Sequence, residues 1–397
     1  MRILVLGGAG LQGRAVLHDL SRSRQVKEVV CADTNIAPLS PFKTFLDMDK
    51  IRLRRVDVTE TPSLVSLMSE GFDVVIDVLP AAFLGKVAEA ALEAKVHVVN
   101  TMYRHQLPTG VHEKALDKGI ILMPESGLDP GIDLILCGLG MNQLDEVTEL
   151  HSYCGGIPEP KAATNPLKYK ISWTWQGVLS FYKMPARIIK DGRIIDITPS
   201  DLHSEAWMKT MDVPGVGELE LILNGDAVTF AERMGLSSTL RNTTRCTMRW
   251  PGHAALWKAL VDLNFLSDEP VKGLPFEITP YRFMVNHLEP QLQYKEGERD
   301  WVVLRTIVAG KKGGRGMRIT YDLFDMRDLE TGLFAMNRTV GYTASIVAQM
   351  IAAGHIRAKG LLTAIKDIPY REFLAEISKR GIQIKENIET EEIMFAS

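Results

Sequence analysis

The sequence is poor in the residues that mark disulfide-rich or zinc-stapled proteins. Among 397 residues there are 4 cysteines, and they lie far apart without a CxxC pair or a histidine at ligand spacing. Neither a zinc site nor a disulfide framework is therefore expected. We expect no bound metal, reduced thiols and a cytoplasmic protein.

Long apolar runs and clusters of one charge are also missing. The opening segment 1–6 carries a single basic residue and a short apolar run, so neither a signal peptide nor a membrane span is expected there, and no other stretch is long enough to span. Lys and Arg number 46 against 49 Asp and Glu, a formal charge of -3, and the cations are dispersed. This pattern argues against nucleic acid or a membrane as partner and favours small molecules.

The length exceeds what one hydrophobic core usually organises, so two domains are expected. Up to about residue 125, short β-branched runs alternate with helical spacing, which predicts an α/β Rossmann domain with a doubly wound parallel sheet. The expected strands are 3–6, 28–32, 74–78, 97–100 and 120–123. The expected helices are 15–22, 62–69, 85–94 and 111–118.

The second half has longer, alternating, aromatic-rich segments, at 150–153, 169–173, 244–250, 302–309 and 317–324. They predict an antiparallel or mixed sheet with helices on one side, an α+β domain. Segment 310–316 is typical of a hairpin tip, and a helix over 343–353, after a turn at Gly341, is expected to return to the first domain. The predicted boundaries are 1–127 completed by 340–397, and 128–339.

A glycine-rich loop after the first expected strand is the clearest functional motif. Gly8, Gly10 and Gly13 form a GxGxxG pattern that follows a strand and opens a helix. Gly8 is expected to make a tight turn, Gly10 to let the backbone approach a pyrophosphate, and Gly13 to pack the helix closely. The residues predicted to hold a dinucleotide here are Gly8, Gly10, Leu11, Gln12 and Gly13. The alternative is a tight turn without a ligand.

Asp33 indicates which dinucleotide the loop takes. It stands twenty residues after Gly13, at the end of the second expected strand. A carboxylate there accepts hydrogen bonds from the adenosine ribose and repels a 2′-phosphate, so NAD is expected and NADP is disfavoured. Arginines such as Arg54 or Arg55 nearby would weaken that preference. The alternative is that Asp33 only caps a loop.

Residues at the ends of later strands are expected to border the nicotinamide and the substrate, because ligands bind beyond the carboxyl ends of parallel strands. Leu79 and Pro80 follow one strand, although a simple strand-ending turn explains them equally. Thr101 and Tyr103 follow another.

Asp129 lies in a glycine- and proline-rich bend after the last expected strand of the first domain. Its carboxylate can hold an amine or assist proton transfer. Alternatively it caps a helix that starts at Pro130, and both roles can hold at once.

With these residues in place, the chain resembles the saccharopine dehydrogenase family, in its saccharopine reductase and lysine 6-dehydrogenase branches. The resemblance runs over nearly the whole chain and rests on motifs in a fixed order. Besides the glycine loop and the bend 127–131, they are YCGGIP at 153–158, NPLKYKISW at 165–173, RCTMRWPGH at 245–253 and KALVDL at 258–263.

The resemblance implies a central domain that binds substrate and forms the contact of a homodimer, and chemistry at a carbon–nitrogen bond that passes through an imine. Asp129 and Cys154 match the acid–base positions. Tyr169 and Lys170 fall in the substrate-facing stretch, where Lys170 is a further catalytic candidate.

Arg249 and His253, in the motif at 245–253, offer partners for carboxylates, and His253 is a candidate catalytic group. Each functional role has a structural alternative. Cys154 can be a small buried residue, Arg249 can pair with a surface acid, and His253 can cap a helix.

Two features separate the branches. Saccharopine reductases resemble one another in an arginine after the tryptophan strand, which can bind the extra dicarboxylate of their substrate, and this chain has Gln176 at that position. They also usually prefer NADP, whose binding Asp33 disfavours. The expected function is therefore NAD-dependent oxidative deamination of the L-lysine side chain. The alternatives are a glutamate-forming saccharopine dehydrogenase and a non-catalytic NAD-binding sensor.

Overall fold

The computed structural model describes residues 1–236 and 238–390 and divides the chain into two compact units. Of the described residues, unit 1 contains 1–139 and 328–383, and unit 2 contains 140–327 and 384–390. The C-terminal segment therefore returns to the first domain, as expected, but its last strand leaves again. Within the described part of the chain, no helix is both long and apolar enough to cross a bilayer.

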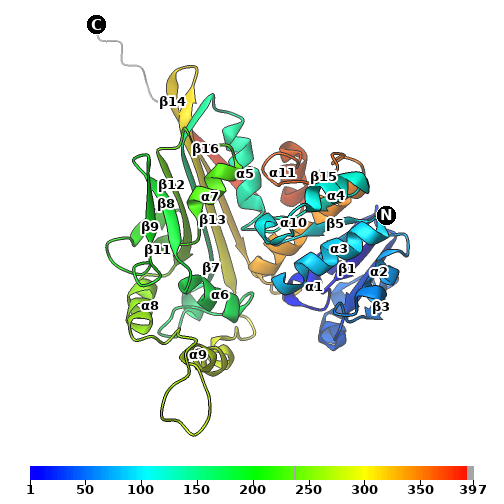
Figure 1. Ribbon diagram of the computed structural model, residues 1–397, viewed down its shortest axis with the longest axis horizontal. Coiled ribbons are helices and arrows are strands. Elements are labelled where there is room, and N and C mark those ends of the chain that lie inside the picture. The colour runs from blue at the N-terminus through cyan, green and yellow to red at the C-terminus, as the bar shows by residue number, and fades with distance from the viewer. Residues whose placement is uncertain (237, 391–397) are drawn as a thin grey trace. The chain divides into compact units, whose positions relative to one another are not determined.

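Unit 1 is a Rossmann domain with a seven-stranded parallel sheet in the order β15-β6-β5-β4-β1-β2-β3 (Figure 1). Its strands are β1 (Arg2–Leu6), β2 (Glu28–Asp33), β3 (Ile51–Arg55), β4 (Val74–Asp77), β5 (His97–Asn100), β6 (Ile121–Met123) and β15 (Gly360–Leu361). Its helices are α1 (Leu11–Arg22), α2 (Thr61–Met68), α3 (Leu84–Ala94), α4 (Val111–Asp117), α10 (Ala335–Ala352) and α11 (Tyr370–Lys379), and α5 (Ile132–Met141) ends at the unit boundary.

The expected α/β fold is confirmed, and the differences have local causes. Strand β3 was missed because its sequence, IRLRR, is an edge strand with mostly polar, exposed side chains. The turn expected at Gly341 is wrong: α10 runs through it. A Cβ there would lie 2.6 Å from Ala15 Cβ on α1, so this glycine allows α10 and α1 to pack closely. Figure 1 shows the two helices side by side.

Unit 2 is built on a mixed sheet whose main path is β10-β11-β12-β7-β13-β14-β16, with β8 and β9 branching from β12. The strands are β7 (Glu146–Pro158), β8 (Ala186–Lys190), β9 (Arg193–Ile197), β10 (Lys209–Val213), β11 (Gly217–Leu223), β12 (Asn242–Arg249), β13 (Asp300–Lys312), β14 (Arg315–Met326) and β16 (Gln383–Thr390). The helices are α6 (Trp175–Tyr182), α7 (Ala227–Arg233), α8 (His253–Asp262) and α9 (Pro280–Leu288).

Among the described residues of unit 2, one buried apolar cluster lies on the strands of the mixed sheet and another is built largely from the helices α6, α8 and α9. The segment 169–173, expected as a strand, is irregular chain instead, because its aromatic side chains are buried in a helical cluster with Trp175, Tyr182 and Trp257. The hairpin expected at 310–316 is confirmed, and its tip is Gly313–Gly314 between β13 and β14. Short 3-10 turns, at 37–45, 81–83, 104–106, 160–162 and 289–292, complete the chain.

Candidate active site

The glycine loop joins β1 to α1 with the geometry of a phosphate-binding turn. The left-handed residue is Gly7, with φ of 79°, and not Gly8. A Cβ at Gly8 would lie 2.5 Å from Cys31 Sγ, and one at Gly13 would lie 2.3 Å from Gly7 O, so close packing requires glycine at both. Gly10 is the exposed residue before α1 and meets only Gly7 O, at 3.3 Å, which leaves room for a phosphate.

The first turn of α1 presents backbone rather than side chains. Gln12 is engaged inside unit 1, where Asn337 Nδ2 donates to its Oε1 at 3.1 Å. Leu11 begins the helix, and no acidic residue stands in this first turn. No carboxylate in that turn therefore neutralises the positive end of the helix. This leaves the helix end able to bind an anion.

Asp33 ends β2 next to this loop. Its Oδ2 accepts the N–H of Ala9 at 3.1 Å, which ties the acid to the loop itself. Two arginines border the same place: Arg14 Nε donates to Ala9 O at 3.2 Å, and Arg55, opposite Asp33 on β3, donates through Nε to Thr34 O at 2.9 Å. The carboxylate suits ribose hydroxyls, and the flanking guanidinium groups suit a phosphate.

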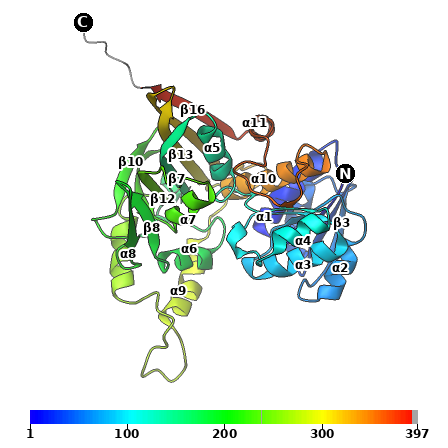
Figure 2. The same cartoon turned by 45° about the horizontal axis from the view of Figure 1, so that its top comes forward.

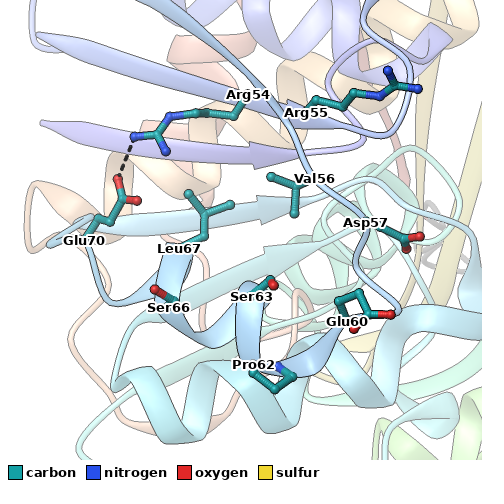
Figure 3. A pocket seen from close by; sticks show the side chains of 10 residues that line it. All are labelled: Arg54, Arg55, Val56, Asp57, Glu60, Pro62, Ser63, Ser66, Leu67 and Glu70. Atoms are coloured by element: carbon teal, nitrogen blue, oxygen red, sulfur yellow. Dashed lines mark hydrogen bonds and ion pairs between the residues drawn. The ribbon is translucent and has the colours of Figure 1, made fainter.

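An open hollow of about 520 Å³ lies between β3 and α2 (Figure 3). On its left side Arg54 Nη2 points to Glu70 Oε2, 3.3 Å away. None of its lining residues belongs to the glycine loop, so the hollow is not the dinucleotide site predicted there. The lining consists of Arg54, Arg55, Val56, Asp57, Glu60, Pro62, Ser63, Ser66, Leu67 and Glu70.

Strand β4 ends in a buried acid that the sequence reading missed. Asp77 is 3% exposed, and burial raises its pKa to about 7 although Leu79 N–H donates to its Oδ1 at 3.0 Å. Leu79 borders the glycine turn, since its Cδ2 lies 3.1 Å from where a Cβ of Gly7 would be, and Pro80 is exposed beside it. The available signal was a charged residue closing an otherwise apolar strand, VVID.

Tyr103 and Asp129 meet at the carboxyl edge of the same sheet. The Tyr103 hydroxyl donates to Asp129 Oδ1 at 3.1 Å, and Asp129 is partly exposed. Helix α5 begins at Ile132, and the carboxylate that accepts an N–H at its start is Asp133, from Gly131 at 2.8 Å. The helix therefore does not start at Pro130, where the cap alternative for Asp129 placed it.

Thr101 is buried behind this edge. It is 9% exposed, and its Cβ lies 3.4 Å from where a Cβ of Gly127 would be, so it packs under the bend that carries Asp129. Unit 1 thus brings together the glycine loop residues and, at neighbouring strand ends, a hydrogen-bonded tyrosine–carboxylate pair.

Unit 2 carries the other predicted residues, around β7 and β12. Cys154 is partly exposed and pairs with Thr247 on β12. Arg249 stands two residues further along that strand, on the same face, and its charge interacts with Cys154. Tyr169 lies below the guanidinium, with Arg249 Cζ 5.1 Å from its ring centroid.

Arg249 is a buried cation without a counterion. It is 6% exposed, and its Nη1 donates to Met248 O at 2.9 Å, while the buried Nε has no hydrogen-bond partner. Within the part of the chain that the structure describes, no carboxylate forms an ion pair with it, so the alternative of a surface salt bridge is wrong. An unpaired buried charge is costly, and an anionic ligand would relieve that cost.

Two predicted residues are already engaged. His253 is 1% exposed, its Nδ1 lies 2.7 Å from Leu167 O, and its Nε2 lies 2.7 Å from the Tyr182 hydroxyl. Burial, followed by the charge of Arg249, lowers the pKa of His253 well below its usual value, so the ring is neutral. His253 is the first residue of α8, as the alternative of a helix cap requires, but no side chain forms a capping hydrogen bond at this helix start.

Lys170 is also buried, and its Nζ forms an ion pair with Glu298 Oε2 at 2.5 Å. Gln176 lies exposed in the first turn of α6, where its carbonyl accepts bonds from Ser180 and Tyr281. The sequence reading missed Tyr182, whose only signal was its place at the end of an apolar helix.

Fold and sites together define a dinucleotide-binding protein of the Rossmann class with a second α+β domain that presents a buried arginine. Two family models cover the chain: the saccharopine dehydrogenase NADP binding domain matches residues 3–123, and the saccharopine dehydrogenase C-terminal domain matches residues 127–382. The chain belongs to the saccharopine dehydrogenase family, which confirms the resemblance.

Relatives agree with this assignment. The chain is 27% identical to the saccharopine dehydrogenase [NADP(+), L-glutamate-forming] of Pyricularia oryzae, over 84% of this chain and 88% of that protein. It is 27% identical to the alpha-aminoadipic semialdehyde synthases of Arabidopsis thaliana and mouse, of which it spans only 39% and 47%. The structure of apo saccharopine dehydrogenase (L-Glu forming) from Saccharomyces cerevisiae matches 98% of this chain and 99% of that chain, with a TM-score of 0.84 and 25% identity.

Proposed function

We propose that the protein is an NAD(P)-dependent oxidoreductase that acts on a carbon–nitrogen bond of an amino-acid substrate. The observation that carries the substrate class is Arg249, a buried guanidinium with a free Nε–H and no counterion among the described residues. Arginine matches a carboxylate in charge and in geometry. A carboxylate of the substrate would complete this site.

Saccharopine, a secondary amine, is the substrate that the names of the relatives favour over lysine. The expectation of L-lysine rested on Asp33 and on Gln176, and the exposed position of Gln176 gives it no support from the geometry. We therefore place saccharopine first and keep oxidative deamination of lysine as the second candidate, because a carboxylate such as Asp33 disfavours the 2′-phosphate of NADP.

The residues of unit 1 fit a dinucleotide, because Cβ atoms at Gly8 and Gly13 would clash and Gly10 leaves open space. The loop and Asp33 would hold it, and the bound nicotinamide supplies hydride transfer. We propose NAD as the preferred form on the strength of Asp33, although the relatives are named for NADP(+).

The chain's own residues supply binding and proton transfer. Arg249 binds a carboxylate, and Asp129, oriented by the Tyr103 hydroxyl, accepts the amine proton and serves the later hydrolysis of the oxidised product. We keep Cys154 as a further acid–base candidate because it shares the Arg249 face. Lys170, tied to Glu298, and His253, tied at both nitrogens, act by holding structure.

Absorbance at 340 nm tests the proposal. Purified protein is mixed with NAD or NADP and with saccharopine, lysine or ornithine, and reduced cofactor is followed. Turnover of saccharopine supports the first candidate, and turnover of lysine alone supports the second. Tight cofactor binding without turnover of any substrate would instead indicate a non-catalytic NAD sensor.

We also propose a homodimer, joined at β16. This strand ends the sheet path, no described strand pairs with its outer edge, and every residue from 385 to 390 is exposed (Figure 2). Lys385 and Glu389 lie on one face. In an antiparallel pair centred on Asn387, Lys385 would stand opposite Glu389 of the partner subunit, and the reverse pair would form by symmetry.

A further inference from the structure

Tyr182, at the end of α6, joins Arg249 to His253 inside unit 2. It is 3% exposed, and its hydroxyl interacts with His253 Nε2 at 2.7 Å and with the Arg249 guanidinium. His253 continues the connection to Leu167 O, also at 2.7 Å. These contacts form one chain of hydrogen bonds that ends on the backbone.

The direction of each bond in this chain follows from its two ends. A carbonyl can only accept, so His253 Nδ1 carries the proton that points to Leu167. Because burial keeps the ring neutral, Nε2 has no proton and must accept from the Tyr182 hydroxyl. The Tyr182 oxygen is then left as an acceptor, and an N–H of Arg249 is the donor that fills it.

Aromatic neighbours hold Tyr182 in place. His203 meets its ring edge-on at a centroid distance of 4.8 Å and an angle of 88°, and Trp257 packs at 4.9 Å. Burial lowers the pKa of His203 to about 4, so this ring adds no charge at neutral pH. The ring of Tyr182 cannot turn without opening the cluster, and the direction of its hydroxyl is fixed as well.

We propose that Tyr182 and His253 are positioning residues that orient the Arg249 guanidinium for a substrate carboxylate. This inference rests on the proposed function of Arg249. The Nη1 bond to Met248 O and the bond to Tyr182 together fix the guanidinium plane, and the buried Nε–H is left for the ligand. Neither Tyr182 nor His253 touches the substrate in this arrangement.

The first test is Tyr182→Phe, which removes the hydroxyl and keeps the ring. A hydrogen bond to a charged group is at stake, so KM for saccharopine is expected to rise roughly 10- to 100-fold while kcat changes little. Tyr281→Phe is the matched control, because Tyr281 is partly exposed and its hydroxyl donates to the Gln176 carbonyl of the same unit. An unchanged KM in a folded Tyr182→Phe protein overturns the proposal.

Two His253 variants separate positioning from general stability. Gln places an oxygen near the Nε2 position and can still accept from Tyr182, whereas Asn keeps a donor for Leu167 O and loses that acceptor. His253→Gln is expected to keep a KM closer to that of the unchanged protein than His253→Asn. Equal KM values at equal thermal stability, or the reverse order, would count against the chain.

Calorimetric binding of saccharopine to the NADH complex distinguishes a failure of the proposed function from a failure of the positioning role. If Arg249→Met leaves saccharopine affinity unchanged, or if the unchanged protein does not bind saccharopine, the proposed role of Arg249 towards saccharopine fails and the inference falls with it. If Arg249→Met weakens binding but Tyr182→Phe does not, only the positioning role is refuted. Weaker binding in both, with NADH affinity preserved, supports both.

Discussion

Replacing Asp77 by asparagine is expected to stabilise the protein at pH 8 and to matter much less near pH 4. The side chain closes β4 with 3% exposure, and burial raises its pKa from 3.8 to about 7. An acid whose pKa is raised by folding stabilises the native state fully below pH 3.8, and that contribution is lost as the pH rises to 7. Above pH 7 the protein carries a buried, destabilising charge.

The size of the effect follows from the pKa shift. One pH unit of titration corresponds to about 1.4 kcal/mol, so the interval from 3.8 to 7 corresponds to about 4 kcal/mol. From pH 5 to pH 8, only the roughly two pH units below the folded pKa of about 7 contribute. The stabilisation by Asp77→Asn is therefore expected to grow by about 3 kcal/mol over this range. Asparagine keeps an oxygen for the Leu79 N–H, so the strand end is preserved.

Urea unfolding at pH 5, 6, 7 and 8 measures this growth in the free energy of unfolding. Asp117→Asn is the control, because Asp117 is an exposed acid at the end of α4 and should show no such trend. The reasoning is refuted if the gain from Asp77→Asn is the same at all four pH values, or if the variant is less stable than the unchanged protein at pH 8.

Three further predictions concern function and assembly. Asp33→Ser is expected to raise KM for NAD about tenfold and to lower KM for NADP, and adding Arg55→Ala should cancel the NADP gain; an unchanged cofactor ratio would contradict the role of Asp33. Asp129→Asn is expected to bind the dinucleotide normally, by fluorescence titration, and to lose at least 100-fold in kcat; full activity would remove it from the acid–base role. Lys385→Glu or Glu389→Lys alone should dissociate the dimer in light scattering, and the double exchange should restore it; a dimer insensitive to all three variants excludes the β16 contact.

The sequence was sufficient for the parts of the fold that depend on local patterns. Buried parallel strands such as His97–Asn100 can be predicted from consecutive β-branched residues, and a GxGxxG motif after a strand indicates a dinucleotide-binding loop. The turn residue shifted by one position, from Gly8 to Gly7, because sequence spacing does not distinguish a positive φ from a close approach. The predicted boundaries placed residues 383–390 with the Rossmann domain, whereas strand β16 joins the sheet of unit 2. Its side chains are mostly polar and exposed, so no apolar pattern indicates which domain it packs against.

Substrate residues were predicted by motif and could not be sorted by role. Lys170, Arg249 and His253 all lie in matched motifs, yet of these three only Arg249 keeps a buried N–H without a partner. The reason is long-range: Glu298, which neutralises Lys170, lies 128 residues away, and Tyr182 lies 71 residues before His253. No local pattern in a single sequence reports such pairs.

The contrast between the two buried cations explains how the second unit can select an anion. Lys170 and Arg249 are similarly buried, at 4% and 6% exposure, but the first forms an ion pair with Glu298, whereas the described neighbours of the second are a carbonyl, a hydroxyl, a ring and the Cys154 thiol. Neutral partners orient a guanidinium without cancelling its charge. A carboxylate partner would have satisfied Arg249 and closed the site, whereas the chain through Tyr182 and His253 leaves the charge uncompensated and its direction fixed. A carboxylate introduced beside Arg249 should therefore abolish substrate binding, because it would neutralise the guanidinium that the substrate needs. Tyr182→Glu is expected to lose more saccharopine affinity than Tyr182→Phe, and calorimetric binding to both variants measures the difference; equal affinities would contradict the role of the uncompensated charge.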